Sequence, residues 1–205
     1  MIFPRATPAA LFALLACSHA QEPAPGKAPP NAARADALAA FETVRTVLQS
    51  PRCVNCHPAG DQPLQGDDSH VHLQFVQRGP EGRGVAGLGC ATCHGKANPP
   101  ESYGEHMPPG VATEWRLPPP KQKMVFAGLS SHDLCEQLKD PHRNGAKDPA
   151  ALFHHMSEDA ITLWGWSPGY GRKPVAIPHD DFVRAFKTWQ DAGFPCAPAA
   201  NASNP

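Results

Sequence analysis

Two five-residue stretches decide how this chain is interpreted: Cys53-Val54-Asn55-Cys56-His57 and Cys90-Ala91-Thr92-Cys93-His94. Both follow the pattern Cys-x-x-Cys-His, which is the attachment pattern of c-type haem. The two-residue gap lets one tight turn present two thiols to neighbouring edges of a porphyrin, and the next residue then lies under the iron as an axial ligand. The sequence therefore predicts two covalently bound haem c groups. The predicted cofactor-binding residues are Cys53, Cys56, His57, Cys90, Cys93 and His94.

Two other uses of paired cysteines fit these stretches less well. Structural zinc sites also join two Cys-x-x-Cys pairs, but the usual gap is about 12–20 residues. Here 33 residues separate Cys56 from Cys90, and zinc does not require the histidine that follows each pair. Thiol oxidoreductases place Cys-x-x-Cys at a helix start in a βαβ context, and no such context is visible around either pair.

Each iron also needs a second axial ligand, and the chain has many histidines and methionines that could supply it. The candidates are His70, His72, His106, His132, His142, His154, His155, His179, Met107, Met124 and Met156. His72 is favoured because it lies between the two motifs, where closing a short loop costs little entropy. His155 is favoured because it falls on an expected amphipathic helix that would bury it against an apolar haem face.

The predicted iron ligands are thus His57, His94, His72 and His155, and His70, His106 and Met107 remain rivals for the second positions. The choice has a physical consequence, because a methionine ligand raises the reduction potential of a haem and a pair of histidines lowers it.

The first twenty residues have the features of an export signal. Arg5 is their only charged side chain, residues 9–16 form a short apolar run, and residues 18–20 fit a small-x-small cleavage site. The run is too short to span a bilayer, which takes roughly 20 apolar residues. The alternative is a lipobox at residues 14–17, in which Cys17 would be lipidated. The sequence predicts a periplasmic protein, attached to a membrane only if Cys17 carries lipid.

The expected fold class is mainly α, a small loop-rich c-type cytochrome domain with short helices wrapped around two haems. The chain has 25 prolines among 205 residues, which favours irregular backbone. The expected division is a signal peptide over 1–20, a flexible linker over 21–31, a dihaem domain over 32–197 and a disordered tail over 198–205. Helical periodicity predicts helices over 32–49, 131–139, 148–156, 157–164 and 178–192. Ser50-Pro51 should end the first of these, and Ser130 or Ser131 and Asp148 should cap the second and third. Residues 58–120 are expected to be loops with a strand-like fragment at 72–77.

Two cysteines, Cys135 and Cys196, lie outside the motifs and the N-terminal segment. In an oxidising compartment they most simply pair as a disulfide. The alternative is that one thiolate ligates a haem iron, which would indicate an enzyme. Four basic residues of the expected loop region are candidate partners for haem propionates, with solvated loop charges as the alternative: Arg78, Arg83, Arg116 and Lys121.

Several runs spread over most of the mature chain carry a family resemblance. They are Cys53–Gly60, Pro63–Asp68, Val76–Gly79, Cys90–Gly95, Leu138–Pro141, Arg143–Gly145 and Trp164–Gly169. Together they resemble a group of small bacterial exported dihaem cytochromes, some of which are labelled isoquinoline 1-oxidoreductase subunit. The label implies service to a molybdenum hydroxylase. Since this chain has none of the iron–sulfur cysteine patterns of such a catalytic subunit, the resemblance implies an electron-transfer partner rather than that activity here.

The function that these observations favour is shuttling of electrons between redox proteins, with a molybdenum hydroxylase or a respiratory-chain component as partner. Two alternatives stay open. One is a dihaem enzyme, such as a peroxidase or a sulfur-compound oxidoreductase, with one open or displaceable axial position. The other is a haem-based sensor or ligand carrier. The formal net charge of −1 gives no reason to expect binding to nucleic acid.

Overall fold

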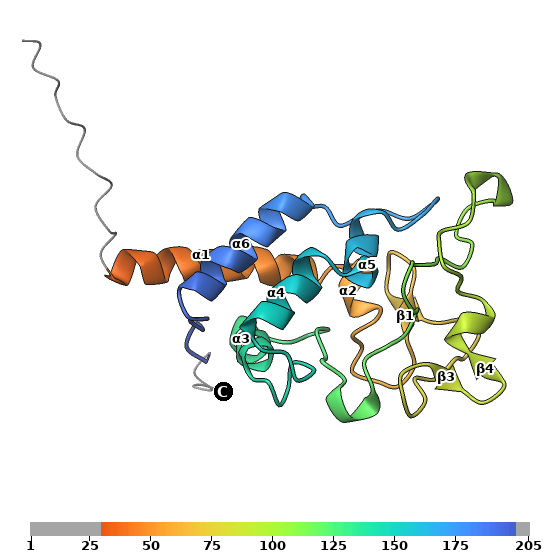
Figure 1. The fold of residues 1–205 in the computed structure, drawn as a ribbon, viewed down its shortest axis with the longest axis horizontal. Helices are drawn as coiled ribbons and strands as arrows, with labels where there is room; N and C mark the ends of the chain where they lie inside the picture. Colours follow the sequence, from red (N-terminus) through yellow and green to blue (C-terminus); the bar gives the residue numbers. More distant parts are fainter. Residues whose placement is uncertain (1–29, 200–205) are drawn as a thin grey trace, which may run out of the picture.

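Helix α1 (Pro30–Leu48) and helix α6 (His179–Asp191) lie against each other in the computed structural model, which describes residues 30–199 (Figure 1). The predicted signal peptide, the cleavage site and Cys17 lie outside these residues, as do residues 200–205 of the predicted tail. Helix α1 starts two residues before the expected position, because proline is well tolerated at the first position of a helix.

The remaining helices are short and pack around this pair. They are α2 (Pro51–Val54), α3 (Ser131–Lys139), α4 (Pro149–Ser157) and α5 (Ala160–Leu163). The predicted caps are confirmed: the side chain of Ser130 accepts a hydrogen bond from Asp133 N, and that of Asp148 accepts one from Ala151 N. Helix α2 was not expected. Ser50 and Pro51 end α1 as predicted, but Pro51 also opens a new turn of helix that contains the first cysteine of the first motif.

The main hydrophobic core lies between these helices. Phe182, Phe186 and Trp189 of α6 are fully buried, and Trp189 packs on Phe41 of α1 with ring centroids 4.6 Å apart. The residues of this core come from 41–54 and 124–189. We call residues 30–57 and 124–199 the helical part and residues 58–123 the loop segment. The helical part therefore has an apolar core of its own, to which the loop segment contributes no member.

The loop segment contains two small antiparallel hairpins and three single turns of 3₁₀ helix. The hairpins pair β1 (Leu64–Gln65) with β2 (His70–Val71), and β3 (Gly84–Val85) with β4 (Leu88–Gly89). The turns are Cys90–Thr92, Glu101–Tyr103 and Pro120–Gln122, and a fourth, Trp164–Trp166, lies in the helical part. The prediction of an irregular region is confirmed, and the mainly helical class holds for the described residues.

The expected strand-like fragment at 72–77 was wrong. The paired residues lie before it, at 64–65 and 70–71, and Phe75 has a φ of 54°, which is incompatible with an extended strand. Alternation of residue types is too short a signal here to override the local turn.

A buried arginine holds the loop segment together. The Arg78 side chain is 1% exposed, and its guanidinium donates hydrogen bonds to Gly60 O at 3.0 Å and to Pro118 O, and pairs with Asp61. The expectation of a solvated loop charge was wrong for Arg78, because its side chain is buried. Its role as a propionate partner stays a prediction. Gly79 follows with φ +68°, and a Cβ there would lie 1.8 Å from Gly84 O, so only glycine fits.

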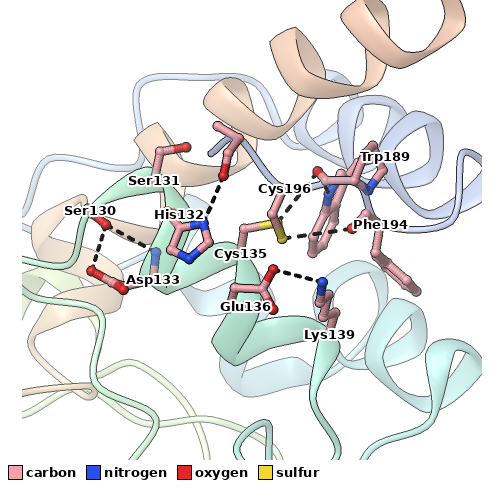
Figure 2. Close-up of a disulfide and its surroundings, with 12 residues drawn as sticks. Ser130, Ser131, His132, Asp133, Cys135, Glu136, Lys139, Trp189, Phe194 and Cys196 are labelled. Atoms are coloured by element: carbon pink, nitrogen blue, oxygen red, sulfur yellow. Dashed lines mark hydrogen bonds and ion pairs between the residues drawn. A yellow bond between two sulfur atoms is a disulfide. The ribbon is translucent and has the colours of Figure 1, made fainter. Parts of the chain in front are cut away.

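Cys135 and Cys196 form a disulfide that ties α3 to the segment after α6 (Figure 2). Hydrogen bonds support the same connection: His132 Nδ1 donates to Ala197 O at 2.8 Å and Trp189 Nε1 to Pro195 O at 3.1 Å. The predicted pairing is confirmed, and neither sulfur is left to bind an iron. Within residues 30–199, no helix combines the length and apolar character needed to cross a bilayer.

Candidate cofactor-binding sites

The first Cys-x-x-Cys-His motif begins inside α2 and ends in the turn that follows. Backbone hydrogen bonds from Cys56 N and His57 N to Cys53 O, both 3.1 Å, wind the five residues into one tight turn. Burial raises the pKa of the Cys53 thiol to about 11 and that of the Cys56 thiol to about 12. A dithiol oxidoreductase needs the opposite, a lowered thiol pKa, so this environment does not favour that alternative.

The ring of His57 is fixed by contacts on two sides. Its Nδ1 donates a hydrogen bond to Met124 O at 2.8 Å, and its face stacks on Phe126 with ring centroids 3.9 Å apart. Burial lowers the pKa of His57 to about 3, against the hydrogen bond to Met124, so the ring is neutral. With Nδ1 carrying the proton, Nε2 is the nitrogen that remains to bind a metal.

His155 lies on α4, whose neighbouring residues Phe153 and Met156 belong to the same hydrophobic cluster as Cys53 of the first motif. A charge on His155 also lowers the pKa of His57. The side chain of His155 is 21% exposed, and its Nδ1 bonds Asp159 Oδ2 at 2.6 Å. Burial lowers the pKa of His155 as well, although Asp159 opposes the shift. This is the arrangement found in metal-ligating histidines, in which a carboxylate holds one ring nitrogen and leaves the other free.

The second motif forms a 3₁₀ turn after strand β4 and repeats the pattern of the first. His94 N bonds Cys90 O at 3.0 Å, and His94 Nδ1 donates to Pro109 O at 2.8 Å. The ring of His94 stacks on Trp115 at a centroid distance of 4.5 Å with an interplanar angle of 2°. Burial lowers the pKa of His94 to about 4. Cys93, in contrast with the first motif, is exposed to solvent.

His72 stands opposite His94, with ring centroids 6.4 Å apart and ring planes at 63°. It follows strand β2, whose pairing with β1 brings the end of the hairpin back towards the second motif. Among residues 30–199, His72 Nδ1 is buried and has no hydrogen-bond partner. The structure places the ring of His72 beside that of His94, and its role as a ligand stays a prediction.

Aromatic and charged side chains connect the surroundings of the two motifs. Trp115, which stacks on His94, makes an edge contact with Trp164 at 4.9 Å, and the guanidinium of Arg52 lies over Trp164 at 5.7 Å. Arg52 directly precedes Cys53. The two motifs therefore lie in one connected region of the molecule rather than at opposite ends.

The structure brings the other candidate ligands into different roles. His70 Nδ1 bonds Asp68, and His132 and His179 bond the carbonyls of Ala197 and Met156. His106 is exposed. The segment that contains His106 and Met107 continues to Pro109, whose carbonyl oxygen accepts a hydrogen bond from Nδ1 of His94. This segment therefore approaches His94 at Nδ1 and not at Nε2. The remaining candidates are the exposed His142 and His154 and the core residues Met124 and Met156.

An open groove of about 550 Å³ begins directly after His57, within the range of about 300–1,000 Å³ that is typical of ligand pockets. Its lining includes Pro58, Ala59, Leu64 and Val71. In the part of the chain that is described, no three His, Cys, Asp or Glu side chains converge on one point as they would around a tetrahedral metal. A haem iron makes no such demand, since the porphyrin provides four ligands and the protein one or two.

Sequence reasoning missed the groups that fix the two motif histidines. Met124 O and Pro109 O lie 67 and 15 residues from the rings they bind, and Phe126 and Trp115 are the stacking partners. A backbone carbonyl has no sequence signature, so only the fold reveals it.

Comparisons of the chain with protein-family models, with curated proteins and with solved structures find no match.

Proposed function

We propose that the protein is a dihaem c-type cytochrome that transfers electrons between redox partners outside the cytoplasm. The observation that carries the proposal is the pair of histidines at the second motif, His72 and His94, in the context of two Cys-x-x-Cys-His stretches. At the first motif, His155 is proposed as the second ligand beside His57, because its helix packs in the same hydrophobic cluster as Cys53.

The separation of His72 and His94 fits two ligands of one metal. With metal–nitrogen bonds of about 2.0 Å on either side, the centroids of two trans imidazoles lie roughly 6 Å apart. The distance in the structure is 6.4 Å. Stacked rings lie closer, at 4.5 Å for His94 and Trp115, while tilted pairs in the core, such as Phe182 and Phe186, lie 6.2 Å apart. The separation of His72 and His94 is therefore wide enough for both rings to bind one metal ion.

Each protein group has a definite role in this proposal. The four motif cysteines form thioether bonds, and His57 and His94 bind iron through Nε2. Met124 O and Pro109 O fix the tautomer of these rings, and Phe126 and Trp115 fix their planes. When bound, haem supplies a one-electron redox couple, and the protein sets its potential and limits access of other reactants.

If His72 and His155 bound the irons as well as His94 and His57, no position would remain open for a substrate, and this favours electron transfer over catalysis. The dihaem-enzyme alternative has one observation in its favour. His72 Nδ1 has no partner within the described part of the chain, so His72 is the least firmly held of the four ligands and the easiest to displace. Turnover of peroxide or thiosulfate, or binding of carbon monoxide to the reduced protein, would move the assignment to an enzyme.

The partner is proposed to be a redox protein, either a molybdenum hydroxylase or a respiratory-chain component, and its docking point is the surface around Cys93, the exposed cysteine of the second motif. Export to the periplasm is part of the proposal, and the disulfide between Cys135 and Cys196 supports it because disulfides persist in oxidising compartments. Attachment to a membrane would follow only from lipidation at Cys17.

Expression with a cytochrome maturation system and export to the periplasm tests the cofactor. The mass of the purified protein should increase by two haems. The double substitution Cys53→Ser with Cys56→Ser should remove one haem, and the same change at Cys90 and Cys93 should remove the other. A colourless protein of unmodified mass would refute the proposal.

The axial ligands are tested by two substitutions, each with a neighbouring histidine as control. His72→Ala and His155→Ala should each convert one haem from low spin to high spin in optical and paramagnetic-resonance spectra. His70→Ala and His154→Ala should leave both haems low-spin, because these rings bond carboxylates at the surface. An unchanged spectrum for His72→Ala or His155→Ala would move that ligand to another side chain.

A further inference from the structure

The four histidines at the two motifs differ in what holds their Nδ1 atom. His57 and His94 donate to backbone carbonyls, His155 bonds the carboxylate of Asp159 at 2.6 Å, and His72 has no partner in the described range. The two sites are therefore alike on the motif side and different on the opposite side. On that side, His155 has a carboxylate partner, Asp159, and His72 has none in the described range.

A carboxylate behind an axial imidazole changes the metal as well as the ring. It fixes the tautomer and orientation of the imidazole and makes the metal-binding nitrogen a stronger donor. A stronger donor stabilises the ferric state more than the ferrous state and so lowers the reduction potential, because hydrogen bonding around the axial ligand is one of the ways in which a protein tunes a haem.

We propose that Asp159 is a positioning residue that acts through His155 and lowers the reduction potential of the haem at Cys53–His57 alone, so that the two haems are not equivalent. The inference rests on the proposed function, since it needs both haems to be present. It goes beyond that function because it assigns an electronic difference between the two sites to one side chain.

Within residues 30–199, the contacts of the Asp159 side chain besides the one to His155 do not include a helix cap. Asp159 is the residue before α5, but its side chain makes no capping hydrogen bond, and the helix start is held by its backbone oxygen, which accepts from Thr162 N and Leu163 N. Asparagine would keep these backbone bonds and the side-chain shape while losing the charge. His154 Nε2 also approaches Asp159, at 3.4 Å, but His154 is exposed.

One neighbouring cation also acts on this site. A positive charge on Lys147 lowers the pKa of both His57 and His155. Since Lys147 is unchanged in an Asp159 variant, comparing that variant with the original protein isolates the contribution of the carboxylate.

The experiment is a redox titration of the dihaem protein, followed optically and by paramagnetic resonance, for Asp159→Asn and for Glu158→Gln. Glu158 is the matched control: it is the adjacent residue, carries the same charge and pairs with His154 rather than His155. Asp159→Asn should change the ferric-to-ferrous equilibrium of one haem roughly tenfold, a rise of about 59 mV for a one-electron couple. The other haem and the whole Glu158→Gln titration should stay unchanged.

Repeating the titration in the His72→Ala variant identifies the haem whose reduction potential shifts. There the second-motif haem is high-spin, so the Asp159→Asn shift should appear in the haem that remains low-spin. Two haems with unchanged potentials, a shift in the high-spin haem, or an equal shift in Glu158→Gln would each overturn the inference while leaving the proposed function intact. A protein without haem would instead overturn the proposed function.

Discussion

The helical part and the loop segment present the same five-residue motif in two different surroundings. In the helical part, α2 places Cys53 against a core that includes Phe182 and Phe186, both 0% exposed. In the loop segment, Cys90 follows a two-residue strand, and the buried apolar side chains are Val111, Leu117 and the two prolines Pro58 and Pro109. The first motif is therefore supported by packing and the second by hydrogen bonds, stacking and turns.

The difference teaches where a cofactor is structurally required. Apolar burial is the main term that offsets the entropy lost when a chain is ordered. The helical part has enough of this burial to fold around its own core. The loop segment orders more than sixty residues with few buried apolar side chains, so we expect the second haem to supply the missing apolar surface.

The largest expected effect is the loss of order in one part without the other. Removing the second haem by Cys90→Ser with Cys93→Ser should reduce amide-exchange protection of residues 58–123 to that of an unfolded chain, while α1 and α6 stay protected. Removing the first haem by Cys53→Ser with Cys56→Ser should leave α1 and α6 protected as well. Hydrogen exchange read by mass spectrometry measures both, and a loop segment that stays protected without its haem would contradict the comparison.

Substituting one phenylalanine in each part tests whether apolar burial stabilises the helical part more than the loop segment. Phe186→Ala removes a fully buried ring from the core and should cost about 3–5 kcal/mol. Phe75→Ala removes a ring that is 76% exposed in the loop segment and should change stability by less than about 0.5 kcal/mol. Denaturant unfolding of the holoprotein measures both. A large cost for Phe75→Ala would mean that the loop segment has a core that its exposure does not reveal.

The buried histidine of the helical part makes the haem-free protein sensitive to acid. The pKa of His57 is about 3 in the fold, against about 6.5 in an unfolded chain. The unfolded state therefore binds a proton that the folded state does not, and stability should fall as the pH falls from about 6.5 to about 3. Unfolding of haem-free protein across this range should show the slope. His57→Asn should reduce it, whereas His94→Asn should not, since the loop segment around His94 is expected to be disordered without haem.

The smallest effect contrasts two arginines of the loop segment. Arg78→Met leaves Gly60 O and Pro118 O without their donor and should cost about 1–3 kcal/mol. Arg83→Met breaks an exposed pair with Glu114 and should cost about 0–1 kcal/mol. Thermal unfolding of the holoprotein compares them, and equal costs would show that Arg78 does not hold the segment together.

How far the sequence predicted this molecule depended on the range of the interactions involved. Helices α3 and α4 were predicted with their caps because Ser130 and Asp148 act within three residues. The pairing of Cys135 with Cys196 was predicted by elimination among the cysteines. The strand-like fragment at 72–77 was wrong because a few alternating residues do not outweigh a local turn.

By itself, the sequence determined the two cysteine motifs, the helical segments other than α2 and the disulfide, since each depends on neighbouring residues or on a small number of equivalent ones. Only the tertiary structure decided which side chains face each other: His72 opposite His94, Asp159 behind His155, Met124 O and Pro109 O behind the motif histidines. The physical reason is that these contacts depend on how loops close in three dimensions, and backbone carbonyls and ring orientations leave no trace in the order of residues.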